Sequence, residues 1–185
     1  MAISITVITT ASRARRFLQT DAASVEQILE SLKRSSQIFA GKPLIVGSAG
    51  QTEVFSPGSI ACVEIEASRD LNAYVPTSQN LTLTALTPEQ VGMPFTGATD
   101  GEHVRARIDF FFTGGHVLHT RAEGVRKAAL AERLMNLTSL FERPVISYHL
   151  AQGGIGLMNP QAMTRFLISP GVPDLPRDAW LADSV

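Results

Sequence analysis

The sequence predicts an α+β fold made of two tandem strand-helix-strand-strand repeats, and three recurring landmarks support this prediction. An alternating apolar pattern typical of a strand opens each repeat, at residues 3–7 and again at residues 104–112. A helical stripe of apolar residues follows, and it ends at an aromatic residue and a proline. Each repeat then closes with a short apolar run, a proline-containing turn and a last apolar strand. Because the landmarks keep their order and spacing, we expect an internal duplication with a pseudo-twofold relation.

Few identities accompany this order of landmarks, so the prediction of a duplication depends mainly on the order itself. The identical pairs are Leu32 and Leu134, Phe39 and Phe141, Pro43 and Pro144, Ile45 and Ile146, Pro57 and Pro160, and Ile65 and Ile168. We therefore divide the chain into four segments. They are a first repeat (1–86), a linker (87–103), a second repeat (104–169) and a proline-rich C-terminal tail (170–185).

The first repeat is expected to be a small, mostly antiparallel sheet covered by one helix. The helix begins at Ser24, with Gln27 as a capping-box partner three residues later. It ends at Gly41, a left-handed cap, and Pro43 prevents its continuation. The other apolar runs indicate strands at residues 3–7, 17–19, 44–46, 52–55, 60–66 and 81–85.

The second repeat is expected to have the same architecture. Its first strand, 104–112, reaches a glycine turn at Thr113–Gly115 and returns through residues 116–119. A helix is predicted over residues 123–140. The closing strands are expected at residues 145–150, 156–158 and 163–168. Three prolines follow in the tail, and Trp180, the only tryptophan, is expected to anchor it on this subunit or a neighbour.

Composition indicates an intracellular protein that associates with itself. Apolar residues make up 44% of the 185 residues, enough for a core, and charged residues make up only 18%. An average soluble domain has about 25% charged residues, so part of this surface is expected to be covered by another subunit. The only cysteine, Cys62, allows no intrachain disulfide and fits a reducing, cytoplasmic setting. No apolar run approaches the length that crosses a membrane.

No motif in the sequence indicates catalysis, a cofactor or a metal, so we expect a protein that is not an enzyme. Lys42 precedes Pro43 instead of the Ser or Thr of a phosphate-binding loop. Cys62 lies in a predicted strand beside Glu64 and Glu66, which would disfavour its thiolate. The four histidines do not have the spacing of a convergent zinc site.

Five arginines form the candidate contacts for an alternative function, binding of nucleic acid. They are Arg13, Arg15, Arg16, Arg121 and Arg126. The two groups lie at roughly equivalent places of the repeats, so a pseudo-twofold could align them on one face. Net charge does not favour this alternative, because the chain carries 16 basic and 17 acidic residues.

Self-association is the leading functional prediction, through an assembly or regulatory role. Its candidate residues are Phe110, Phe111 and Phe112, whose consecutive placement covers both faces of a strand, together with Trp180. Homo-oligomers and another protein partner are the expected partners. A small-molecule sensor with a pocket between the repeats is a third possibility, because clefts between domains are common ligand sites.

The second repeat resembles a small uncharacterised bacterial domain type. In that type a strand and glycine turn precede a helix with an Arg-Leu-x-Asp-x-Leu-Asn-like phrase, then an aromatic residue, then an Asn-(Lys/Pro) turn between strands. The matching pieces here are Thr113–Gly115, Arg133–Leu137, Phe141 and Met158–Met163. Met135 and Asn136 depart from the helix phrase. The resemblance implies a bacterial origin and no function.

Overall fold

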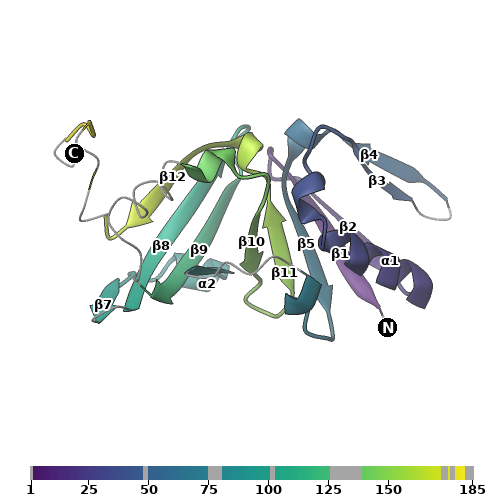
Figure 1. Cartoon of the computed structure of the whole chain (residues 1–185), viewed down its shortest axis with the longest axis horizontal. Helices are drawn as coiled ribbons and strands as arrows, with labels where there is room; N and C mark the ends of the chain where they lie inside the picture. The colour runs from purple at the N-terminus through teal and green to yellow at the C-terminus, as the bar shows by residue number, and fades with distance from the viewer. Residues whose placement is uncertain are drawn as a thin grey trace.

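The two halves of the chain share one sheet. The structure is a computed structural model that describes residues 2–47, 50–74, 81–100, 103–125, 139–171, 175 and 178–181. In these residues ten strands belong to one mixed sheet, and β3 and β4 form a separate two-stranded ribbon (Figure 1). The expectation of two small sheets, each covered by its own helix, is therefore wrong. The reason is that strands of the second half pair with strands of the first, so the sheet continues across both.

The first half follows the predicted order of strands and helix. Its elements are β1 (Ile3–Thr9), β2 (Ala14–Gln19), α1 (Ala22–Leu32), the 3-10 helix η1 (Ser35–Gln37), β3 (Leu44–Gly47), β4 (Thr52–Phe55), the 3-10 helix η2 (Pro57–Ser59) and β5 (Ile60–Ala67). A short 3-10 helix, η3 (Asn72–Tyr74), comes after β5.

The second half follows the same order over the residues that the structure describes. Between the halves lie β6 (Leu81–Ala85), α2 (Pro88–Val91) and β7 (Ala98–Asp100), the last two within the expected linker. The elements of the second half are β8 (His103–Phe112), β9 (Val117–Val125), the 3-10 helix η4 (Ser139–Glu142), β10 (Ile146–His149), β11 (Ile155–Met158), the 3-10 helix η5 (Pro160–Ala162) and β12 (Met163–Ser169).

Both predicted helices differ from the structure at their ends. Helix α1 begins after Asp21, whose carboxylate accepts a hydrogen bond from the amide of Ser24 at 2.9 Å, so Asp21 is the N-cap. It ends at Leu32 instead of Gly41, and η1 follows it. In the second half, β9 continues to Val125, beyond the predicted start of the helix. The rest of that predicted helix, up to residue 138, lies outside the described residues. Neither α1 nor α2 is long and apolar enough to cross a membrane.

The order of strands across the sheet is β12-β8-β9-β6-β10-β11-β5-β1-β2, with β7 paired to β8. Figure 1 shows β12 at one end of this layer, while β1, β2, α1 and the ribbon gather at the other end. Strand β6, which follows the first half in sequence, pairs with β9 and β10 of the second half. Strand β6 therefore lies among strands of the second half, and β5 of the first half continues the sheet next to β11.

Strand pairing within the two halves matches at a constant offset of 103 positions. In the β1–β5 pair Ile5 faces Ile65, and in the β8–β12 pair Ile108 faces Ile168. The registers of β1–β2 and β8–β9 obey the same offset. The three-stranded unit β2-β1-β5 therefore has the same pairing as β9-β8-β12.

Local irregularities also match at this offset. Ala61 has no partner in the register of the β1–β5 pair, and Thr164 has none in the register of the β8–β12 pair. Each pair therefore has a β-bulge at the same place. The amide of Thr10 donates to the last carbonyl of η2, and the amide of Thr113 donates to the last carbonyl of η5, both at 2.9 Å. Bulges and turns are therefore placed alike in the two units.

Two buried clusters lie on opposite faces of β5 and β11, because alternate residues of these strands belong to different clusters. The first core joins α1 to the β1–β5 face and includes Ile3, Ile5, Val7, Val25, Leu29, Leu32, Phe39, Phe55, Val63, Ile65, Ile155 and Leu157. The second core includes Cys62, Leu83, Ile108, Phe110, Phe112, Leu118, Ile146, Tyr148, Met158 and Met163. Strand β11 thus contributes side chains to both.

Candidate interaction surface

The junction between the halves is an antiparallel pairing of β11 with β5. Leu157 faces Val63 and Ile155 faces Ile65. The side chains of Ile155 and Leu157 are buried in the first core, together with residues of α1 and β1. A hairpin of the second half thus contributes to the core of the first half, and the apolar area that it buries stabilises this junction.

Asn159 joins the halves just beyond β11. Its side-chain amide donates to the carbonyls of Pro57 at 2.9 Å and Ile60 at 3.0 Å, and its backbone amide donates to Ala61 at 2.9 Å. Its side-chain oxygen accepts from the amide of Gln161, which caps η5. This buried side chain therefore satisfies backbone groups of both halves at once.

A polar contact crosses the junction on the opposite face. The ring of Tyr148 lies over Gly156, where an added Cβ would come within 2.0 Å of the ring. The Tyr148 hydroxyl then donates to the carboxylate of Glu64 on β5 at 2.9 Å. Burial raises the pKa of Glu64, and the hydrogen bond from Tyr148 opposes that increase. Burial also raises the pKa of the Cys62 thiol, so this thiol is a poor nucleophile.

The ribbon formed by β3 and β4 has one buried face and one exposed face. Leu44, Val46 and Phe55 point to the first core. Ile45 and Val54, which face each other across the ribbon, are 63% and 62% exposed. Two contacts join the ribbon to β2 of the sheet. The Phe17 ring packs edge-to-face against the Phe55 ring, and the Arg15 guanidinium forms a bidentate ion pair with the Glu53 carboxylate. No other strand of the described residues pairs with the ribbon.

Strand β12 forms one end of the sheet, and among the described residues only β8 pairs with it. Phe166 contacts Phe110 and Phe141 at ring-centroid distances of 6.2 and 5.5 Å. Leu167, on the other face, is 47% exposed. One backbone edge of β12 is therefore unpaired among the described residues, and it lies beside the second core, against which Phe166 packs.

Strand β2 forms the opposite end of the sheet and carries most of the first arginine cluster. Leu18 on this strand is 72% exposed. Arg16 donates to Ser4 at 2.6 Å and pairs with Glu66 at 2.8 Å, and Arg15 pairs with Glu53. Charged residues of this kind protect an edge strand from adventitious pairing.

The predicted nucleic-acid contacts are mostly engaged within the chain. Besides Arg15 and Arg16, Arg121 lies 3.2 Å from the carboxylate of Glu123, whereas Arg13 is exposed. Arg126 lies outside the described residues. Carboxylate partners next to the arginines reduce the positive potential that a phosphate backbone would meet.

The predicted self-association residues divide into buried and exposed ones. Phe110 and Phe112 are buried in the second core of their own chain, so they present no surface to a partner. Phe111 is half-buried, and the guanidinium of Arg165 lies 3.6 Å above its ring. Trp180 is 99% exposed. Sequence reasoning missed the exposed Ile45 and Val54, although the unbroken apolar run at 44–46 was a signal of two apolar faces.

Two histidines take part in polar contacts near the hairpin turns. His119 lies 2.8 Å from Asp109, which also accepts from Arg107 at 2.8 Å. His116 lies 3.1 Å from the Ser12 hydroxyl, and burial lowers the pKa of this imidazole. Among the residues that the structure describes, neither pair has a further aligned group that would make a catalytic triad. No group of three metal-ligating side chains occurs within the described part of the chain.

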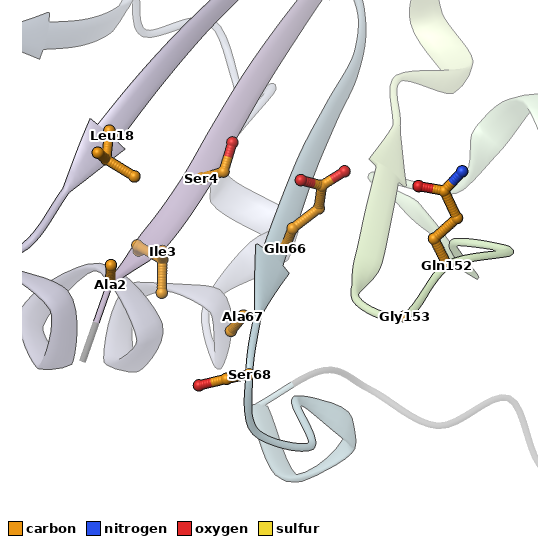
Figure 2. Close-up of a pocket in the computed structure, with 9 residues that line it drawn as sticks. All are labelled: Ala2, Ile3, Ser4, Leu18, Glu66, Ala67, Ser68, Gln152 and Gly153. Atoms are coloured by element: carbon orange, nitrogen blue, oxygen red, sulfur yellow. The ribbon is translucent and has the colours of Figure 1, made fainter.

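An open pocket of about 310 Å³ lies between β1, the end of β5 and the loop before β11 (Figure 2). In Figure 2 Ser4 and Glu66 stand on neighbouring strands, and Gln152 faces them from the loop. Ser4 and Glu66 already bind Arg16, so their polar atoms are partly engaged. A second pocket of about 350 Å³ shares Ala67, Ser68 and Gly153 with the first and continues toward His149. Both pockets therefore lie at the junction of the halves.

The comparisons with known proteins return no relatives for this chain. No family model, no curated protein and no solved structure matches it. The resemblance of the second repeat to a bacterial domain type accordingly stays a prediction.

Proposed function

We propose that this chain is an assembly or regulatory protein, without catalytic activity, that acts by binding copies of itself through strand edges. The observation that supports this most is the β3–β4 ribbon. A two-stranded ribbon is marginally stable by itself, and this one exposes the apolar pair Ile45 and Val54. A further strand paired with β4 would satisfy the open backbone edge of the ribbon and place its side chains beside the exposed Val54.

One end of the main sheet adds support. Leu167 on the outermost strand β12 is an exposed apolar residue, whereas β2 at the other end carries the paired Arg15 and Arg16. Natural sheets usually protect such edges, so an apolar edge that remains open is a candidate for pairing with another chain. We place this function in the cytoplasm, because Cys62 is a buried free thiol.

Analytical ultracentrifugation over a concentration series tests self-association directly. We expect a defined oligomer in equilibrium with smaller species at tens of micromolar protein. A protein that stays monomeric throughout this range would contradict the proposed function.

We also propose that the two halves derive from an internal duplication. The constant offset of 103 positions in pairing, bulges and turn hydrogen bonds supports this proposal. An experimental structure in which β2-β1-β5 and β9-β8-β12 failed to superimpose with residues matched at this offset would argue against it.

Binding of a small molecule is a second candidate function, favoured by the two adjoining pockets at the junction. Native mass spectrometry of the purified protein tests it through retained small-molecule mass. The nucleic-acid alternative has weaker support because Arg15, Arg16 and Arg121 pair with carboxylates. An electrophoretic mobility-shift assay with labelled oligonucleotide tests this alternative. Salt-dependent binding that becomes weaker when Arg13 is replaced by Ala would support it.

A further inference from the structure

We propose that copies of this chain join by antiparallel pairing of β4 in one copy with β12 in the next. In this arrangement Val54 enters the second core of the neighbouring copy beside Phe166. The inference rests on the proposed self-association and names the surface and the register through which it occurs.

The template for this contact is already present inside the chain. Strand β11 is the second strand of a hairpin, and it precedes a 3-10 helix that begins with a proline, η5. Strand β4 has the same position before η2. Strand β11 pairs with β5, and the equivalent of β5 in the second half is β12. The equivalent contact, β4 on β12, is absent from the described residues of a single chain.

The register of the β11–β5 pair predicts the register of the proposed β4–β12 pair, because equivalent residues of the two halves differ by 103 positions. Within the chain Leu157 faces Val63, which places Val54 opposite Phe166. Gly156 faces Glu64, which places Glu53 opposite Leu167. The pairing begins after the bulge at Thr164, as the β5 pairing begins after the bulge at Ala61.

The side chains suit this register. Val54 is the equivalent of buried Leu157 but is exposed, and it would cover the half-buried Phe166 at the margin of the second core. Leu167 would gain contacts from the neighbouring strand. On that same face Arg165 would lie diagonal to Glu53, whose carboxylate pairs with Arg15, so Arg165 would add a second positive charge beside this carboxylate.

The contact must join separate copies. Figure 1 shows the ribbon and β12 at opposite ends of the molecule, so one chain cannot pair its own β4 with its own β12 without dismantling the sheet. The two surfaces are different, so the interface is heterologous. Heterologous contacts close into a ring or continue as an open chain.

A pair of engineered cysteines tests the register. Glu53→Cys with Leu167→Cys places thiols opposite each other, where Cα atoms of facing residues are about 4.5–5.5 Å apart and a disulfide can form. We expect disulfide-linked multimers under mild oxidation. The control is Val54→Cys with Leu167→Cys, whose side chains would point to opposite faces and should not cross-link. Buried Cys62 does not compete.

A second pair of variants tests the contribution of the apolar contact. Val54→Lys would put a charge at the margin of the neighbour's core, so we expect loss of the oligomer with the monomer still folded. Leu18→Lys, at another exposed apolar residue on β2, should leave the oligomer intact. Sedimentation velocity and circular dichroism measure assembly and folding separately.

The outcomes separate this inference from the proposed function. Multimers from the in-register pair alone, together with dissociation by Val54→Lys, support it. An oligomer that neither cross-links in this register nor responds to Val54→Lys overturns it and leaves self-association through another surface. A wild-type monomer at every concentration overturns both.

Discussion

Hairpin β10–β11 and ribbon β3–β4 have the same local structure and different surroundings. Each consists of two four-residue strands that precede a 3-10 helix with proline at its start. The hairpin lies inside the large sheet, and all four residues of β11 are buried. The ribbon leaves Val54 in solvent. Pairing with β5 therefore accounts for the burial of β11, and the ribbon, which pairs with no further strand in the described residues, keeps one face exposed.

The largest expected difference between the two regions concerns the apolar residue at the third position of β11 and β4. Leu157→Ala would leave a cavity in the first core and lower the free energy of unfolding by roughly 2–5 kcal/mol. Val54→Ala should change the free energy of unfolding of the monomer by less than about 0.5 kcal/mol. Urea denaturation of dilute protein compares them, and equal effects would contradict the assigned burial.

Glycine is required in the hairpin and not in the ribbon. Gly156→Ala would push its Cβ into the Tyr148 ring, and relief of this overlap should cost about 1–3 kcal/mol or more. Gly47→Ala in β3 meets only the Thr52 hydroxyl at 3.9 Å and should be nearly neutral. Thermal unfolding of both variants checks this, and a neutral Gly156→Ala would show that the ring does not lie over the strand.

A smaller difference in stability is expected at the residue that follows the second strand of the hairpin and of the ribbon, which is Asn159 after β11 and Ser56 after β4. Asn159→Ala removes hydrogen bonds to the carbonyls of Pro57 and Ile60, which should cost about 1–3 kcal/mol because these buried groups lose their donor. The equivalent Ser56 makes no capping hydrogen bond with its side chain, so Ser56→Ala should have little effect. Hydrogen exchange at β5 and η2 would report the loss locally. Unchanged protection in Asn159→Ala would contradict the role of Asn159 as a link between halves.

The smallest expected effect depends on pH and concerns Glu64. Because burial raises its pKa above the unfolded value, the folded state binds this proton more tightly. Its contribution to stability is therefore present at low pH and is lost as pH rises through the folded pKa. Relative to Glu64→Gln, the wild type should become less stable with rising pH. The difference is read from urea denaturation of both proteins across the acidic to neutral range.

Tyr148→Phe sharpens the same test. It removes the donor that favours the charged form of Glu64, so we expect a further rise in the pKa of Glu64 and a loss of roughly 1 kcal/mol at neutral pH. The loss should shrink in acid. A loss that is independent of pH would mean that Tyr148 acts through packing alone.

Local patterns predicted most individual elements. Alternation at Ile3, Ile5 and Val7 predicted β1, and the proline turns predicted the places of η2 and η5. The end of α1 was predicted too late because apolar spacing continued to Phe39, whereas residues 35–37 form a 3-10 turn with Ser35 buried. Strand β9 was predicted too short, since its last residues are stabilised by pairing with β6 and β8.

Pairing between distant strands could not be predicted in this way. The strand at residues 81–85 was recognised, but its partners lie in the second half. The phenylalanines at 110–112 were expected on a contact surface, yet Phe110 and Phe112 are buried because β12, β9 and η4 surround them. Burial depends on which segments meet, and periodicity carries no information about partners.

The order of strands and helix in the first half followed from the sequence, since side-chain alternation, helical spacing and proline turns act within a few residues. The recurrence of these landmarks in the second half led to the prediction of a duplication. Three features became apparent only in the folded chain: β11 pairs with β5, both cores share this junction, and β4 and β12 have no equivalent partner within the described residues. The physical reason is that hydrogen bonds and apolar burial between strands far apart in the chain form only when the fold brings them together.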